Sequence, residues 1–342
     1  MRPVRTWLTL LLAVASSAGC TTTQASPPPI ERPKPIASEP SLEHTPLDPA
    51  LVRVEPEPRT VGDLFILDLY TFFHAKDYAT YRIEFPSELP VGDAVRESEP
   101  QTVAHLLVPE RPGPHPVVVV FPILAGSHVV SEAFAKVLVN RGYAVLRLER
   151  PRLDLSEATR WDEPAQAFRS AILAARRLLD WAVTEPRLDS TRIATAGISL
   201  GGMLACTLHG VDPRVTAGAY LMAGGGVAEI LHDSTERPVR AFRDHLIARD
   251  GVTDREAFLA RMRPLTDAVD PLRHATRIDP ATALLSSGRF DHVIPPERSE
   301  ALWHALGEPR WIHLPVGHYQ LLPFFWWSAH RAADHFDEVL RK

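Results

Sequence analysis

The sequence RIATAGISLGGM, residues 192–203, decides the fold. Residues 192–198 form an apolar run that predicts a buried strand, and residues 200–209 have the spacing of a helix. Between them, Gly197-Ile198-Ser199-Leu200-Gly201 matches the pattern G-x-S-x-G, in which a serine occupies a tight strand-to-helix turn. Such a turn places the Ser199 hydroxyl at the amino end of the helix, where free backbone amides favour developing negative charge.

Strands alternate with helices on both sides of this turn. Apolar runs predict strands at residues 81–85, 103–108, 117–121, 144–148, 193–198, 215–222, 283–287 and 311–314. Helical spacing recurs at residues 131–140, 164–183, 200–209, 297–306 and 321–340. The run Val117 to Val120 is apolar on both faces, as in a parallel sheet that is covered on both sides. The alternation predicts an α/β fold with a doubly wound, mostly parallel sheet, after an antiparallel start.

The interval 227–278 interrupts this alternation, because it is long, charged and helical where a short connection would suffice. We interpret it as a helical lid, inserted after the strand at 215–222 and covering the site. A passive surface insertion is the alternative.

Two further residues that could complete a catalytic triad with Ser199 follow predicted strands. Asp291 lies after the strand at 283–287 and a glycine turn, and His318 follows the strand at 311–314 in Gly317-His318. Ligands of open α/β sheets gather at the carboxyl ends of the strands, where all three residues are expected. Asp291 alone is equally explained as a turn or helix-cap residue, so the prediction of a site depends on the three together.

From about residue 80 to 340 the chain resembles the α/β-hydrolase superfamily, through three motifs in the family's order Ser, acid, His. Within it, Gly-Ile-Ser-Leu-Gly-Gly and the step Asp270-Pro271 are similar to the dienelactone hydrolase and acetyl esterase-like group. Dienelactone hydrolases proper use cysteine where this chain has Ser199. The resemblance implies that Ser199 is the nucleophile, His318 the base, and Asp291 the residue that orients the base.

The backbone amide of Leu200 is the first expected donor to an oxyanion. The second is expected from the loop after the strand at 117–121. Relatives usually carry His-Gly at the start of this loop, whereas this chain has Pro122, which has no amide hydrogen. The donor is therefore expected from Ile123 or Leu124.

These residues predict a serine hydrolase that cleaves a small-molecule carboxylic ester through an acyl-enzyme. An amidase or peptidase with the same triad is one alternative, and a non-catalytic envelope lipoprotein that uses the fold for binding is another. Trp326 and Trp327 are candidates for an acyl pocket, but adjacent residues on a helix face different ways. One of them is expected to lie in the core.

The first 20 residues are typical of an export signal, with Arg2 and Arg5 before the apolar run 7–15. Ala18-Gly19-Cys20 resembles the lipobox of bacterial lipoproteins, which implies lipidation at Cys20 and a lipid anchor in the cell envelope. A plain secreted or periplasmic protein is the alternative. Dense proline predicts a disordered spacer over residues 21–59, so the catalytic domain is expected at 60–342.

Composition and motifs argue against several classes of ligand and against a disulfide framework. The formal net charge of −5 and the lack of a basic stripe argue against binding of nucleic acid. The chain has 2 cysteines, Cys20 and Cys206, which provide no disulfide framework. The sequence contains neither His-Glu-x-x-His nor Cys-x-x-Cys nor a phosphate-binding Gly-Lys-Ser/Thr, so no metal and no cofactor is expected.

Overall fold

The computed structural model describes residues 42–58, 77–88, 101–124, 128–149, 155 and 160–341. These described residues all belong to one unit of the chain. The predicted export signal at 1–20, Cys20 and the first part of the predicted spacer lie outside the described residues.

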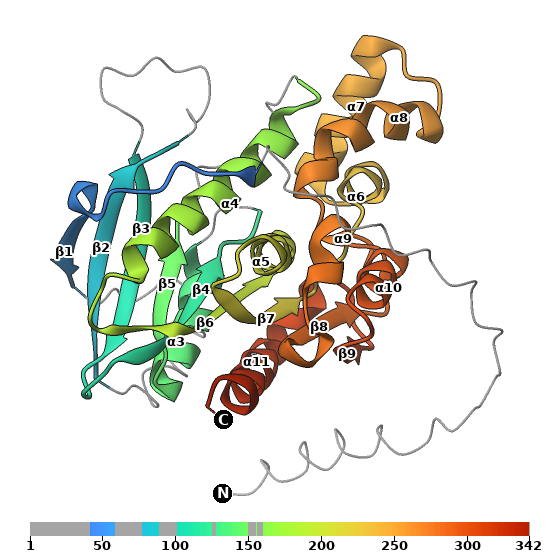
Figure 1. Ribbon diagram of the computed structural model, residues 1–342. Helices are drawn as coiled ribbons and strands as arrows, with labels where there is room; N and C mark the ends of the chain where they lie inside the picture. The colour runs from blue at the N-terminus through green and yellow to red at the C-terminus, as the bar shows by residue number, and fades with distance from the viewer. Residues whose placement is uncertain are drawn as a thin grey trace, which may run out of the picture. The chain divides into compact units, whose positions relative to one another are not determined.

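Within the described residues, nine strands form one sheet in the order β1-β2-β3-β5-β4-β6-β7-β8-β9 (Figure 1). The strands are β1 (Arg53–Glu57), β2 (Tyr78–Pro86), β3 (Gln101–Pro109), β4 (His115–Phe121), β5 (Ala144–Leu148), β6 (Leu188–Ile198), β7 (Val215–Leu221), β8 (Ala283–Gly288) and β9 (Arg310–Leu314). Pairs from β1 to β5 along the sheet are antiparallel, and the pairs from β5 onward are parallel. The predicted α/β class and doubly wound sheet are confirmed.

Helices cover both faces of the sheet, which explains the apolar run in β4. Val117 and Val119 pack in one core with side chains of α4 and α5, whereas Val118 and Val120 pack in a second core with α3 and α11. All seven residues of β4 are buried. The longer helices are α3 (His128–Arg141), α4 (Glu163–Ala182), α5 (Leu200–Val211), α7 (Arg237–Asp250), α8 (Arg255–Thr266), α10 (Pro296–Ala305) and α11 (Phe325–Leu340).

The predicted insertion is helical. Between β7 and β8 the chain forms α6 (Val227–Asp233), α7, α8 and the short α9 (Pro271–His274). Phe242 of α7 and Phe258 of α8 are fully buried among these helices, so the insertion has an apolar interior that joins the larger core. Trp161, just before α4, donates from Nε1 to the Asp250 carboxylate at 2.6 Å and ties the insertion to the sheet domain.

Asp270 fixes the two ends of this insertion. Its buried carboxylate accepts hydrogen bonds from the amides of Gly226 at 3.0 Å, Val227 at 2.5 Å and Leu272 at 2.9 Å. Burial raises the pKa of Asp270, while these three amides favour its charged form. Whether the insertion covers Ser199 stays a prediction.

The predicted spacer ends earlier than expected, and its boundary at residue 59 is wrong. β1 (Arg53–Glu57) pairs with β2, and Leu42 and Leu47 are each 3% exposed. Dense proline suggests disorder, but Pro56 lies in the edge strand of the sheet, where proline is tolerated. The folded domain therefore includes residues 42–58.

Candidate active site

Ser199 lies at a strained turn between β6 and α5. Its backbone has φ 58° and ψ −124°, which places it in a region that side chains disfavour. Two hydrogen bonds hold this conformation: the Ser199 amide donates to Leu221 O at 2.8 Å, and Ser199 O accepts from the Met203 amide at 3.1 Å. A Cβ atom at Gly197 would lie 2.2 Å from the Gly201 backbone, so only glycine fits before the serine. The close packing of the turn therefore requires a glycine at the first position of the G-x-S-x-G pattern.

Asp291 is held by the turn that follows β8. The side chain is 2% exposed, and its Oδ1 accepts from the amides of Val293 at 2.8 Å and Ile294 at 2.9 Å. Its Oδ2 accepts from His318 Nδ1 at 2.7 Å. Both carboxylate oxygens are therefore fixed, one by the backbone of its own turn and one by the imidazole.

His318 connects this carboxylate to the serine. Its Nε2 lies 2.9 Å from Ser199 Oγ, and its side chain is 10% exposed. Because Nδ1 donates to Asp291, Nε2 is free of hydrogen in the neutral ring and accepts from the serine hydroxyl. The structure thus brings together the three residues that the sequence analysis selected.

The sheet topology explains why these residues meet. β6, β8 and β9 run in the same direction, so the residues after them lie at one edge of the sheet. The loops after β8 and β9 are also hydrogen-bonded to each other, since the amides of Arg289 and Phe290 donate to Leu314 O at 2.8 Å and Val316 O at 3.0 Å. The acid and the histidine are therefore carried by one joined pair of loops.

The loop after β4 lies directly beside the serine turn. A Cβ atom at Gly201 would lie 2.7 Å from Phe121 O and 2.9 Å from Pro122 O, so this glycine permits close approach of the two backbones. Leu200 is buried as the first residue of α5. Ile123 and Leu124, the expected sources of the second donor, are half-buried directly after this contact.

The inserted helices also contact the two loops. The Tyr319 hydroxyl, next to His318, donates to Glu236 Oε2. The amide and hydroxyl of Thr235 both donate to His292 O at 2.9 Å, next to Asp291. Partial burial and the Glu236 carboxylate raise the pKa of Tyr319, so its hydroxyl stays a donor. The sequence analysis missed Thr235 and Glu236, which belong to no motif.

The two tryptophans near the start of α11 differ in exposure. Trp326 is half-buried and packs against the core between the sheet and α3 and α11, whereas Trp327 is 45% exposed. They face different ways, as expected of neighbours on a helix, and Trp326 is the one that packs against the core.

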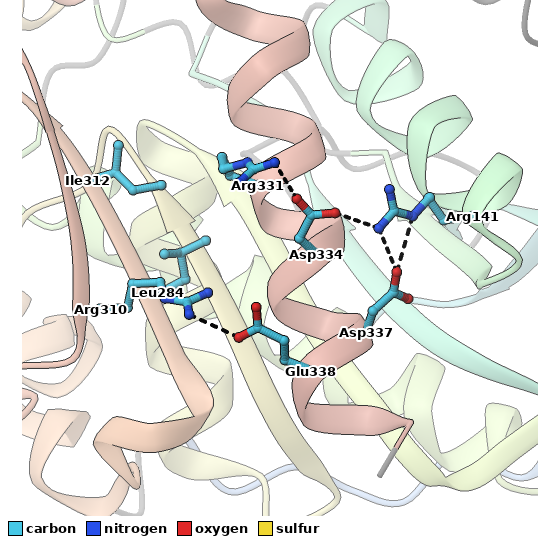
Figure 2. Close-up of a pocket in the computed structure, with 8 residues that line it drawn as sticks. All are labelled: Arg141, Leu284, Arg310, Ile312, Arg331, Asp334, Asp337 and Glu338. Carbon is cyan, nitrogen blue, oxygen red and sulfur yellow. Dashed lines mark hydrogen bonds and ion pairs between the residues drawn. The ribbon is translucent and has the colours of Figure 1, made fainter.

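A cavity of about 300 Å³ lies by the amino ends of β8 and β9, whereas Asp291 and His318 follow the carboxyl ends of these strands. Figure 2 shows that its charged side chains point toward one another: Arg141 binds Asp334 at 2.5 Å and Asp337 at 2.6 Å, and Arg310 binds Glu338 at 3.0 Å. These ion pairs neutralise the charges that line the cavity. It is separate from the site at Ser199.

Other reactive groups in the described part of the chain are buried or dispersed. Cys206 is a free cysteine within α5, and burial raises the pKa of its thiol, which disfavours the reactive thiolate. Among the described residues, no three His, Cys, Asp or Glu side chains gather in a way that could hold a metal ion. The predicted absence of a metal and of a cofactor stays a prediction.

No family model matches the sequence, and no curated protein matches it. Among solved structures, an acetyl xylan esterase from Paenibacillus sp. R4 is similar with a TM-score of 0.62 at 19% identity, over 85% of this chain and 89% of that one. Acetyl xylan esterase 1 from Thermoanaerobacterium sp. JW/SL YS485 gives 0.57 at 17% identity, over 83% and 88% of the two chains. The acylaminoacyl peptidase of Pyrococcus horikoshii gives 0.54 at 15% identity, over 79% and 43%. At these identities the likeness concerns the fold, and the chain has the α/β-hydrolase fold.

Proposed function

We propose that this chain is a serine hydrolase that cleaves a carboxylic ester through an acyl-enzyme. One observation carries the proposal: Ser199 Oγ lies 2.9 Å from His318 Nε2, whose other nitrogen lies 2.7 Å from the buried carboxylate of Asp291. A nucleophile, a base within hydrogen-bond reach and a third group that orients the base are the elements of nucleophilic catalysis by serine.

In the proposed reaction, Ser199 Oγ attacks the ester carbonyl carbon while His318 Nε2 takes the hydroxyl proton. Asp291 keeps the ring oriented and stabilises the imidazolium that forms. His318 then gives the proton to the departing alcohol as the C–O bond breaks, which leaves the acyl group on Ser199. Water, deprotonated by His318, attacks this acyl-enzyme, releases the carboxylic acid and restores the serine hydroxyl.

The negative charge on the carbonyl oxygen requires hydrogen-bond donors. The Leu200 amide, at the amino end of α5, is the proposed first donor, and an amide of Ile123 or Leu124 is the proposed second. The close packing of the loop after β4 on Gly201 supports this second assignment. In serine hydrolases one such donor contributes about 3 kcal/mol to transition-state stabilisation.

Hydrolysis of p-nitrophenyl esters, from the acetate to the octanoate, tests the proposal. The protein assayed consists of residues 21–342. We expect turnover by the wild type and a loss on the order of 10⁴-fold or more in kcat for Ser199→Ala. Ser328→Ala is the matched control, because the Ser328 hydroxyl is buried without a hydrogen-bond partner. A folded wild type that cleaves none of these esters would contradict the proposal and favour the binding-protein alternative.

The same machinery also suits amide bonds, and the similar solved structures include both esterases and a peptidase. p-Nitroanilides with the same acyl groups, measured beside the esters, separate the two activities. We expect the ester to have the higher kcat/KM. A higher value for the anilide would assign the site to amides.

We also propose that the chain is exported and lipidated at Cys20, which rests on the resemblance of residues 1–20 to a lipoprotein signal. No helix in the described part of the structure has the length and apolar character to cross a bilayer. Mass analysis of the mature amino terminus tests the proposal. An unmodified Cys20, or a later first residue, would contradict it.

A further inference from the structure

We infer that Thr235 and Glu236 form a clasp that holds the loops of Asp291 and His318, and that both are positioning residues for the reaction. The inference rests on the proposed function. It assigns to the helical insertion a role in positioning the loops of Asp291 and His318.

The first half of the clasp joins Glu236 to the histidine loop. Glu236 is the residue before α7, and its carboxylate accepts from the hydroxyl of Tyr319. The Tyr319 ring stands at 84° to the His318 ring, with centroids 5.6 Å apart, so it contacts the imidazole edge to face. A displacement of Tyr319 would therefore change the packing of His318.

The second half joins Thr235 to the acid loop. His292 O, the carbonyl directly after Asp291, accepts from both the amide and the hydroxyl of Thr235, each at 2.9 Å. Two donors on one carbonyl oxygen fill both of its lone pairs. Adjacent residues of the insertion thus bind the residue next to the acid and the residue next to the base.

The clasp can hold the two loops in place because the segment that carries Thr235 and Glu236 is itself fixed. Ser234, 2% exposed, closes the end of α6, and its Oγ accepts from the Glu236 amide at 3.2 Å. Asp233, the last residue of α6, binds Arg255 of α8 at 2.7 Å. Contacts within the insertion therefore fix the connection between α6 and α7, and this same connection contacts the loops of Asp291 and His318.

Positioning matters at His318 because the imidazole must keep one hydrogen bond to Asp291 and another to Ser199. Small displacements of a catalytic group lower the rate strongly while leaving the fold intact. The clasp restrains the two loops by contacts that are additional to their attachment to β8 and β9. Its loss should lower kcat more than it raises KM.

Kinetics of p-nitrophenyl acetate hydrolysis by four variants test the clasp. Glu236→Ala and Tyr319→Phe each remove the hydrogen bond, and we expect each to lower kcat by about 3- to 10-fold with little change in KM. The double variant should be no slower than the slower single one, because both remove the same contact. Glu236→Gln keeps an acceptor for the Tyr319 hydroxyl and should restore most of kcat.

Glu300→Ala is the control, since Glu300 is an exposed glutamate of α10, outside the insertion. Clasp variants with wild-type kcat, or losses that multiply in the double variant, would overturn the inference while leaving the proposed function intact. A reduced melting temperature without a change in kcat would assign the clasp a structural role only. A wild type that neither turns over esters nor reacts with a fluorophosphonate would remove the proposed function, and the clasp's role with it.

Discussion

Ser199 illustrates how single residues build this site. Its backbone conformation costs of the order of 1–3 kcal/mol, and neighbouring groups must supply that energy. Two backbone hydrogen bonds and the absence of side chains at Gly197 and Gly201 make the turn possible. The same turn directs the hydroxyl toward His318 and exposes the first amides of α5 beside it. The backbone strain thus has the same origin as the reactivity that we propose for Ser199.

Asp291 provides a residue-level prediction, because Asp291→Asn is nearly isosteric. The amide oxygen can still accept from Val293 and Ile294, while the NH₂ group replaces the oxygen that faces His318 Nδ1. His318 would then carry its hydrogen on Nε2 and could not accept from Ser199. We expect kcat for p-nitrophenyl acetate to fall by about 10⁴-fold, with a far-ultraviolet circular dichroism spectrum like that of the wild type. A loss below about tenfold would show that Asp291 does not set the tautomer.

The three residues of the proposed triad could be selected from the sequence because each has a local signature. Ser199 is flanked by glycines, and Asp291 and His318 follow apolar runs. The clasp residues could not be selected from the sequence in this way. Glu236 and Tyr319 are 83 residues apart, and neither has a neighbour pattern that distinguishes it from ordinary surface residues. Contacts of this kind depend on how the insertion packs, which no local pattern encodes.

At the level of elements, residues 42–51 form a strap across α4. The Asp180 carboxylate of α4 accepts from His44 Nε2 at 2.9 Å and from the Leu47 amide at 2.9 Å. Arg176 donates to Leu42 O at 2.5 Å. The prediction of a spacer fails here because the proline-rich composition of residues 21–59 hides the short ordered part within it. Two buried leucines and one edge strand are too few to produce a visible periodicity.

The strap predicts a difference between two shortened chains. A chain that begins at residue 59 loses β1 and the burial of Leu42 and Leu47, each worth about 2 kcal/mol. We expect its melting temperature to lie at least about 5 °C below that of a chain that begins at residue 42. Differential scanning calorimetry of the two proteins measures this difference. Equal melting temperatures would mean that the strap adds nothing to the stability of the domain.

Most of the strands and longer helices could be predicted because both faces of the sheet are covered. Runs such as residues 117–120 are then apolar throughout and easy to recognise. The helical insertion was found as a break in the alternation. β1 was missed, and β6 begins at Leu188, five residues before the predicted start at 193. Residues 189–192, at the amino end of β6, are polar and exposed or half-buried, so this part of the strand has no apolar run.

For the molecule as a whole, buried histidines couple stability to pH. His209, His274 and His335 are all buried, and burial lowers the pKa of each. His209 Nδ1 lies 2.6 Å from the hydroxyl of Tyr220. Burial raises the pKa of Tyr220, so this hydroxyl donates and the imidazole accepts. Protonation of His209 would remove the acceptor of that bond and place a charge in the core.

Burial lowers the pKa of His209 to about 4. Between its ordinary value of about 6.5 and about 4, only the unfolded chain takes up this proton, so stability falls as the pH falls through that window. The shift corresponds to roughly 3 kcal/mol for His209. Urea unfolding at pH values from 4 to 8 measures the slope. His209→Gln should flatten this slope, and the exposed-site control His245→Gln should not. An unchanged slope in His209→Gln would contradict the assignment.

The central claim, that Ser199 is an activated nucleophile, is tested most directly by reaction with a fluorophosphonate followed by mass spectrometry of the peptides. We predict one covalent phosphonyl adduct, located on Ser199, that does not form when His318 is replaced by alanine. The absence of an adduct on the folded wild type, or an adduct on another serine, would contradict the claim.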